Sequence, residues 1–338
     1  MSGRQTPLDF WLVVLAFVTV APACVGAASD DNLLEAAKRE GEVVYYASMN
    51  LSEANAVIGA FERRYPFIKV KLSRTGSEKL LTRVLTEARA KKTLADVIQT
   101  VEFSMHLFNR GGVLARYVPR SNSLYSKAFK EEGFWTTAYY NTYVSGYNTR
   151  LVAAAALPKT YNDLLDPKWK GKLMMEGTKA EWFAGMLQIM GQERGLKYMR
   201  ELAKQQPSPR EGHELLAQLV VAGEGVIDIN IPAASVERVK ERGAPIDWTA
   251  LGDAPAVMVG IGLAARAPHP SAAKVFLDFV LSREGQKLMQ TPGRLVARGD
   301  LANEQAAMLK GLKIVPVNPD MAEKLDEYAK QLQAIFGS

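Results

Sequence analysis

The chain has 338 residues, of which 48% are hydrophobic and 23% charged, as is ordinary for a soluble globular protein. This length predicts two domains or lobes rather than one small core. The formal net charge is +6, but acidic residues are interleaved with the basic ones, as in "AKRE" and "RVKER". Interleaved charge is typical of solvated helix faces, so no nucleic-acid partner is expected.

Residues 1–28 are predicted to form a cleavable signal peptide. A short basic region precedes an apolar stretch that ends in small residues, and this stretch is too brief to favour a spanning helix. Cleavage after Ala27 or Ala28 fits the pattern. A lipid anchor at Cys24 is the less favoured alternative, because Ala21 stands where a larger aliphatic residue is usual. The chain has one cysteine, so the mature protein is expected to use neither disulfides nor thiolates.

The first part of the mature chain alternates between helical and extended patterns. Helices are predicted at 33–41, 52–66 and 76–92, and strands at 42–48, 68–74 and 95–100. Apolar residues recur with helical spacing in the first set and as short alternating or continuous runs in the second. Because the links are short, the strands are expected to pair in parallel through right-handed crossovers.

The remaining chain continues this alternation. An extended segment is predicted at 139–148, a short helix and a strand within 158–176, two helices within 180–205, and one helix at 212–224. In "GVIDINIPAASVERVKERGAPIDW" (225–248), a β-branched strand breaks at Pro232 and restarts as a helix. Such a break leaves backbone N–H groups free to meet a ligand. A strand, a turn and a helix follow at 256–289, and the tail from Leu301 is mostly helical in pattern.

Six stretches cover nearly the whole mature chain in a characteristic order. They are "EGEVVYYAS", "FERRYPFIKV", "LADVIQT", "YVSGYNTRLV", "LPKTYNDLLDPKWKGKLMM" and "HPSAAKVFLDFVLSREGQKLM". Together they resemble the extracellular solute-binding proteins of ABC importers, most closely the branch that includes the ferric-ion-binding proteins.

The resemblance implies an α/β fold of type II periplasmic-binding architecture, with two lobes that are each a mixed sheet flanked by helices. Crossing strands near Tyr140–Asn148 and Pro255–Leu263 would act as the hinge. The predicted division assigns 29–140 with 255–292 to the first lobe and 141–254 with 293–338 to the second. It also implies a periplasmic monomer that captures a small solute by lobe closure and delivers it to an ABC permease in the inner membrane. A role as the partner of a sensor domain is an open alternative.

Five loops are expected to meet at one cleft, because ligands of open α/β sheets bind beyond strand ends, where helices begin. The loops are "ASMN" (47–50), "RTGS" (74–77), "QTVE" (99–102), "MMEGTKAEW" (174–182) and "NIPAAS" (230–235). With two residues of the predicted crossing strand, they supply the candidate ligand-binding residues Ser48, Met49, Asn50, Thr75, Gly76, Ser77, Thr100, Glu102, Tyr140, Asn141, Glu176, Trp182, Asn230 and Ala233. Trp182 can be interpreted either as a core residue or as a residue that stacks on the ligand.

The cleft is not expected to hold iron. Ferric-binding relatives use adjacent tyrosines in the loop that matches "NIPAAS", where this chain has Pro232, Ala233 and Ala234. Tyr139 and Tyr140 are adjacent elsewhere, but neighbours on a strand point to opposite faces, so one ring is expected to be buried and the other to face the cleft or solvent.

The neutral donors and the helix N-termini favour an anionic solute, such as a carboxylate, a phosphonate or a phosphate ester. If Glu102 or Glu176 faces the cleft, a cationic amine or a zwitterion becomes the better candidate. A metal-ion carrier that uses both glutamates with a synergistic anion is the alternative. His106, His213 and His269 are not at ligand spacing and are expected to be structural or solvated.

No enzyme activity and no cofactor are expected. "GIGLAA" (260–265) matches a dinucleotide-binding fingerprint, but "RAPHP" follows it instead of a helix. Its small residues are better explained by a strand that passes tightly between lobes. Nucleophile-elbow, Walker and zinc-protease motifs do not occur in the sequence.

Overall fold

The computed structural model describes residues 25–302, 304 and 312–337. The predicted signal peptide and Cys24 lie outside these residues, except for 25–28, which begin helix α1 (Val25–Glu40). Among the described residues, no helix is both long enough and apolar enough to cross a membrane.

The first lobe is built on the predicted alternation of strands and helices. Its central strands are β1 (Glu42–Ala47), β2 (Lys69–Arg74) and β3 (Val97–Val101), and the helices that follow them are α2 (Leu51–Arg64), α3 (Ser77–Arg89) and α4 (Glu102–Arg110). Strand β1 pairs in parallel with both β2 and β3. The predicted parallel order is therefore confirmed.

The second lobe has its own strands and helices. Its strands are β6 (Leu173–Glu176), β7 (Ser208–Arg210), β8 (Ile227–Pro232) and β9 (Ile246–Thr249). Its helices are α5 (Ala180–Met190), α6 (Gln192–Ala203), α7 (His213–Ala222), α8 (Ala233–Lys240) and α12 (Leu325–Phe336). Strand β8 breaks at Pro232 and helix α8 begins at the next residue, as the sequence predicts.

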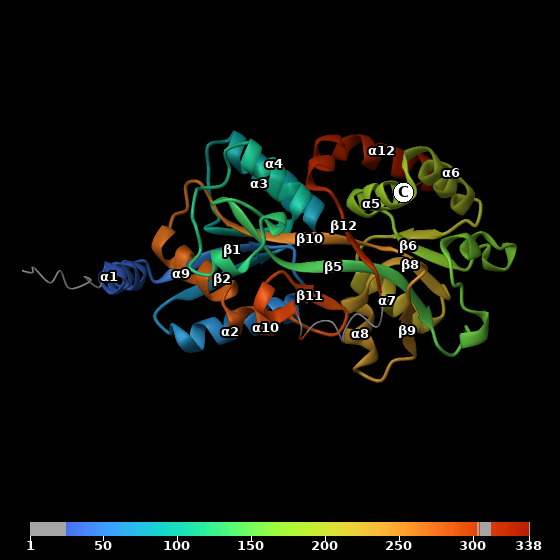
Figure 1. The fold of residues 1–338 in the computed structure, drawn as a ribbon, viewed down its shortest axis with the longest axis horizontal. Helices are drawn as coiled ribbons and strands as arrows, with labels where there is room; N and C mark the ends of the chain where they lie inside the picture. Colours follow the sequence, from blue (N-terminus) through green and yellow to red (C-terminus); the bar gives the residue numbers. More distant parts are fainter. Residues whose placement is uncertain (1–24, 303, 305–311, 338) are drawn as a thin grey trace, which may run out of the picture.

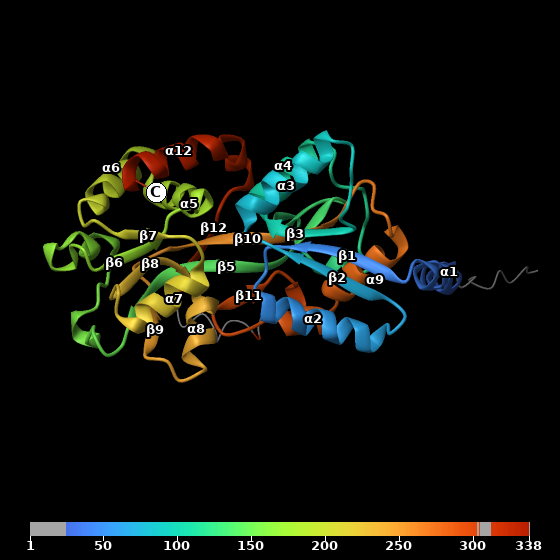
Figure 2. The same ribbon diagram turned by 180° about the vertical axis from the view of Figure 1, so that it is seen from behind.

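Two long strands run between the lobes. Strand β5 (Trp135–Asn148) pairs with β10 (Ala254–Leu263) through its first part, and with β8 and β9 from Tyr143 onward. The strand order is β2-β1-β3-β10-β5-β8-β6-β7, so β5 joins two halves of one continuous sheet. Figure 1 shows both strands crossing the middle of the molecule, with helices on both sides of each lobe, and Figure 2 shows the same arrangement from behind.

The C-terminal part differs from its predicted pattern in two ways. The helical segment after β10 is split into α9 (Pro270–Val280) and α10 (Arg283–Met289), because the Ser282 side chain caps a new helix. The tail also contributes β12 (Ile314–Pro316), which pairs with β10.

Two short strands also pair with β5. Strand β11 (Arg294–Val296) pairs with it at Tyr139–Asn141, and β4 (Lys130–Glu131) at Trp135–Thr136. The predicted division of the chain between the lobes stays a prediction.

The glycines of "GIGLAA" lie where β10 passes close to β5 and α4. A Cβ atom on Gly260 would lie 2.7 Å from the Trp135 ring, and one on Gly262 would lie 2.6 Å from the Phe134 carbonyl oxygen. No helix follows within this segment, since β10 ends at Leu263 and a turn comes next. These glycines therefore serve strand packing rather than phosphate binding.

Candidate functional site

A cleft of about 590 Å³ lies between the two lobes. Its first side is lined by Ser48 and Asn50 after β1, by 74–79 at the end of β2 and just after it, and by Val101 at the end of β3. The second side is lined by the loop after β6, by the start of α7, and by Pro232, Ser235 and Arg238. The predicted meeting of strand-end loops is thus present in the structure.

Six helices among the described residues begin at this cleft. The residues at their N-caps all line it: Asn50 (α2), Gly76 (α3), Val101 (α4), Lys179 (α5), Gly212 (α7) and Pro232 (α8). In α2, Asn50 itself accepts a hydrogen bond from the Ser52 N–H at 2.9 Å, whereas the other five have no side-chain cap. First-turn N–H groups have no acceptor within their own helix, and the helix dipole adds partial positive charge, so this arrangement suits an anion.

The floor of the cleft is one face of β5. Tyr139, Asn141 and Tyr143 line the cleft, as expected for alternate residues of one strand. Tyr140 and Thr142 point to the other face, where both are buried and their hydroxyls have no hydrogen-bond partner among the described residues.

Around Tyr139, the cleft is rich in arginine. We call Arg74, Arg238 and Arg294 the arginine end of the cleft. Glu53 on α2 holds two of them, since one carboxylate oxygen accepts from Arg238 at 2.9 Å and the other from Arg294. The Arg294 guanidinium also lies over the Tyr139 ring, 4.3 Å from its centroid. Burial raises the pKa of Tyr139 to about 12, although the arginines oppose the shift.

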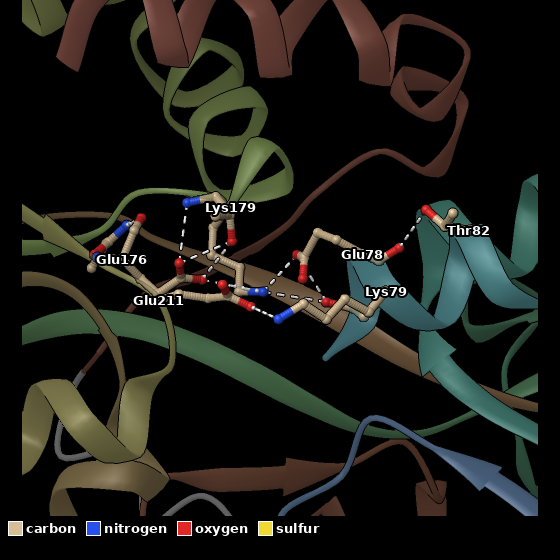
Figure 3. A network of polar contacts seen from close by, with 9 residues as sticks. Glu78, Lys79, Thr82, Glu176, Lys179 and Glu211 are labelled. Carbon is tan, nitrogen blue, oxygen red and sulfur yellow. Dashed lines mark hydrogen bonds and ion pairs between the residues drawn. The ribbon is translucent and has the colours of Figure 1, made fainter. Parts of the chain in front are cut away.

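Around Tyr143, the cleft is rich in carboxylates. We call Glu78, Glu176 and Glu181, which surround the Lys179 ammonium, the carboxylate end. Lys179 donates to Glu78 at 2.6 Å and lies 3.2 Å from Glu176 (Figure 3). Burial raises the pKa of Glu176, and it raises that of Glu181 to about 7, with Lys179 opposing both shifts. Burial alone would lower the pKa of Lys179, but the surrounding carboxylates raise it.

Ion pairs connect the lobes across the cleft. Lys179, at the N-cap of α5, reaches Glu78 of α3, and Lys79 of α3 lies 2.8 Å from Glu211 (Figure 3). On the other side, Arg238 of α8 reaches Glu53 of α2. The lobes are therefore in contact on both flanks of the cleft.

The structure brings only part of the predicted site together. Seven of the predicted residues line the cleft: Ser48, Asn50, Thr75, Gly76, Ser77, Asn141 and Glu176. The other seven do not line it and are buried: Met49, Thr100, Glu102, Tyr140, Trp182, Asn230 and Ala233.

The buried residues have identifiable structural positions. Asn230 accepts from the Glu176 N–H at 2.8 Å and donates to its carbonyl at 3.0 Å, so it fastens β6 to β8 beneath the cleft. Trp182 packs in the core of the second lobe, as its alternative interpretation held. Ala233 lies against Gly293, where a Cβ atom would be 2.7 Å from the Ala233 carbonyl carbon. The small residues of "NIPAAS" thus allow a close backbone approach.

Sequence reasoning missed most of the charged cleft residues. Lys179 and Glu181 lie inside the loop that the sequence singled out, so that loop could have supplied them. Of the adjacent tyrosines, Tyr140 was chosen as the candidate ligand residue, but Tyr139 lines the cleft, because alternation alone does not say which face is buried. No local sequence pattern indicated that Arg238 and Arg294 would line the cleft.

The histidines lie in different surroundings. His213 was expected to be structural or solvated; it lines the cleft, where it packs edge-on to Tyr143 with ring centroids 5.7 Å apart. Burial keeps its pKa well below the usual value. His269 pairs with Asp96 at 2.9 Å outside the cleft. Among the described residues, no group of three or more His, Cys, Asp and Glu side chains is placed to hold a metal ion.

The sequence is similar to known binding proteins. A periplasmic protein of Salmonella typhimurium that is named for 2-aminoethylphosphonate binding is 30% identical over 207 residues, or 57% of each chain. The match therefore spans less than two thirds of that relative. The Fe(3+)-binding periplasmic protein of Serratia marcescens is 23% identical over 293 residues, which are 82% of this chain and 86% of that protein.

The fold is also found in solved structures. The periplasmic binding protein AfuA from Actinobacillus pleuropneumoniae, with fructose-6-phosphate bound, aligns with a TM-score of 0.76 at 21% identity. The alignment covers 88% of this chain and 99% of AfuA. The fold is thus the predicted α/β, two-lobed type II periplasmic-binding fold.

A family model described as bacterial extracellular solute-binding protein matches residues 92–320. This range contains the crossing strands β5 and β10 and most of the second side of the cleft. The chain belongs to the family of bacterial extracellular solute-binding proteins.

Proposed function

We propose that this chain is the periplasmic substrate-binding component of an ABC importer, and that it captures a small organic solute bearing a phosphonate or phosphate-ester group. The observation that carries this proposal is the presence of Arg74, Arg238 and Arg294 at one end of the cleft, beside the start of α8, which has no side-chain N-cap. Arginine donors and first-turn N–H groups are the partners that phosphoryl oxygens take in proteins.

The names of similar proteins support this ligand class. The Salmonella relative is named for a phosphonate, and the AfuA structure holds a sugar phosphate. A carboxylate has two oxygens for the donors of the arginine end, whereas a phosphonate or phosphate has three oxygens and a larger charge. The phosphoryl group therefore satisfies more donors at once.

Capture would proceed by closure of the lobes about β5 and β10. A solute that contacts both lobes binds the closed form more tightly than the open form, so it shifts the population towards closure. The cross-cleft pairs at Glu53 and Glu78 would form in the same motion. Micromolar affinity needs a net binding free energy of about −8 kcal/mol, which several charge-assisted hydrogen bonds can supply. The closed form would then be recognised by the permease, with the binding protein acting as a monomer without enzyme activity.

The metal-carrier alternative is less well supported by the geometry. It required Glu102 and Glu176 to act together, but Glu102 is fully buried and does not line the cleft. Glu176 lies beside Lys179, which already neutralises it.

A thermal-shift and calorimetry screen tests the proposal. The purified protein is titrated with 2-aminoethylphosphonate, fructose-6-phosphate, simple carboxylates, polyamines and ferric citrate, since binding to the folded state raises Tm. A phosphonate or phosphate ester should raise Tm and bind with micromolar or lower Kd. Stabilisation by ferric citrate or by carboxylates alone would overturn the proposed ligand class.

A further inference from the structure

One carboxylate oxygen on the cleft wall has no hydrogen-bond donor among the described residues. Glu181 lies in the first turn of α5, lines the cleft, and is only 4% exposed. Its Oε1 atom has no hydrogen-bond partner among the described residues. A buried acceptor without a donor is unfavourable, so a native protein rarely keeps one without a reason.

The nearby ammonium of Lys179 is bound to other groups. Lys179 contacts the hydroxyl of Ser77 at 3.3 Å, Glu78 at 2.6 Å and Glu176 at 3.2 Å. The contacts with Ser77 and Glu78 are hydrogen bonds and that with Glu176 is an ion pair, whereas no hydrogen bond joins Lys179 to Glu181 among the described residues. Glu181 therefore has the charge of Lys179 nearby but none of its hydrogen bonds.

The other two carboxylates of this end accept hydrogen bonds from nearby side chains. Glu176 accepts from the Thr178 N–H at 3.1 Å and from its hydroxyl at 2.9 Å, in addition to its ion pair. Glu78 accepts from Ser77 at 3.0 Å as well as from Lys179. The carboxylate end thus has three acids, one ammonium, and a single unsatisfied oxygen on the cleft wall.

The titratable groups that act on Glu181 come from β6 and the loop after it, and from α3, β5 and α4. They are Glu176 on β6, Lys179 in that loop, Glu78 on α3, Tyr143 on β5 and Glu102 on α4. Three of these groups are acids and one is a phenol, so the surroundings favour a second cation over any anion.

Resting on the proposed function, we propose that Glu181 accepts a hydrogen bond from an ammonium group of the solute, so that the cleft takes a zwitterion. The phosphonate or phosphate group would lie towards the arginine end, and the amine towards the carboxylate end. A solute ammonium would supply both the missing donor and the missing positive charge.

A ligand and variant cycle tests this inference. Calorimetry at about pH 9, where both ligands are largely dianionic at the phosphonate, compares 2-aminoethylphosphonate with ethylphosphonate, which lacks the amine. Wild type should bind the amine-bearing ligand about 30-fold more tightly, the scale of one charge-assisted hydrogen bond. Glu181→Gln should lose most of this preference while it keeps its affinity for ethylphosphonate.

Glu214→Gln is the matched control, because Glu214 lines the same cleft but pairs with Arg238 at the arginine end. It should keep the preference for the amine. The wild-type comparison needs no variant, so it tests the preference for a zwitterion even if Glu181→Gln does not fold.

Two outcomes overturn the inference while the proposed function stands. The first is equal affinity of wild type for both phosphonates. The second is an equal loss of both affinities in a folded Glu181→Gln protein, which would make the residue structural. If wild type binds neither phosphonate, nor any phosphate ester, the proposed function itself fails and the inference fails with it.

Discussion

Tyr139 and Tyr143 lie four residues apart on the same face of β5, yet their surroundings have opposite charge. Arg294, Arg238 and Arg74 act on the Tyr139 phenol, with Glu53 as the opposing charge. The Tyr143 phenol is instead surrounded by carboxylates, with Glu181 the strongest influence after burial. Four residues of extended strand span about 13 Å, so the cleft has a positive and a negative end within reach of long side chains.

Under the proposed function, this contrast would let one strand contact both the anionic and the cationic group of a solute. The arginine end is supplied by α8, β2 and β11, and its cations are held by Glu53 from α2. The carboxylate end is supplied by the end of β6, the start of α5 and α3. Because the two ends depend on different elements, substitutions at one end should leave the other largely intact.

The largest effect is expected from Arg294→Ala. The substitution removes a buried guanidinium from the arginine end, and truncating one partner of a buried charged hydrogen bond typically costs about 3–4 kcal/mol. Affinity for a phosphonate should fall by 100-fold or more in calorimetry. Arg64→Ala removes an exposed arginine that pairs with Glu284 at 2.8 Å and should leave binding unchanged. Equal binding by both variants would contradict the role of the arginine end.

Glu53→Gln should reduce the free energy of unfolding of the solute-free protein. It takes the shared counter-ion away from two mostly buried arginines, Arg238 and Arg294, and the expected loss is about 2–3 kcal/mol. Urea denaturation measures this loss. Glu284→Gln removes an exposed partner of Arg64 and should cost less than about 0.5 kcal/mol. A loss below about 0.5 kcal/mol for Glu53→Gln would show that the ion pairs of Glu53 with the two arginines do not stabilise the fold.

Gly293→Ala should disturb the arginine end through the backbone. Gly293 has a φ of +76°, and an added Cβ would lie 2.8 Å from the Ala234 nitrogen at the start of α8. Gly171→Ala is the control, because Gly171 has a φ of +70° but no atom within 4 Å of an added Cβ. Both variants should be destabilised by backbone strain in the left-handed region. The free energy of unfolding of Gly293→Ala should fall by about 1–2 kcal/mol more than that of Gly171→Ala, as measured by denaturation. Gly293→Ala should also bind phosphonate less tightly. An equal loss of stability in the two variants would show that the backbone at the start of α8 can move away from a Cβ atom at position 293.

The smallest expected effect is a pH dependence confined to the carboxylate end. Burial holds the pKa of Glu181 near 7 in the solute-free protein, and a bound ammonium favours the ionised form. Binding therefore releases a proton, and affinity rises with pH through this range. The ratio of wild-type to Glu181→Gln affinity for 2-aminoethylphosphonate should increase about tenfold between pH 6 and pH 8, because one group with a pKa near 7 changes its ionised fraction by that factor. The ratio cancels the ionisation of the ligand itself, and a flat ratio would contradict the ammonium subsite.

Several features of the fold could be predicted from local patterns. The strands β1, β2 and β3 with their helices, and the break at Pro232, followed from hydrophobic period and turn chemistry. The loops at the cleft followed from the rule that ligands bind at strand ends. Within those loops, however, half of the predicted residues do not line the cleft. Asn230 illustrates why, since its amide satisfies the backbone of Glu176 on a neighbouring strand that only the folded sheet brings near.

The sequence by itself determined the order of the elements, the family resemblance and the loops that meet at the cleft, because periodicity, capping and turn residues act over short stretches of chain. Only the tertiary structure decided which charges meet. Glu53 and Arg294 are 241 residues apart, yet they share an ion pair beside Tyr139. The face of β5 that carries Tyr139 rather than Tyr140 is set by its pairing with β10 and β8. The unsatisfied oxygen of Glu181 likewise exists because Lys179 finds its partners on α3 and β6, and such a choice depends on distances that no local pattern encodes.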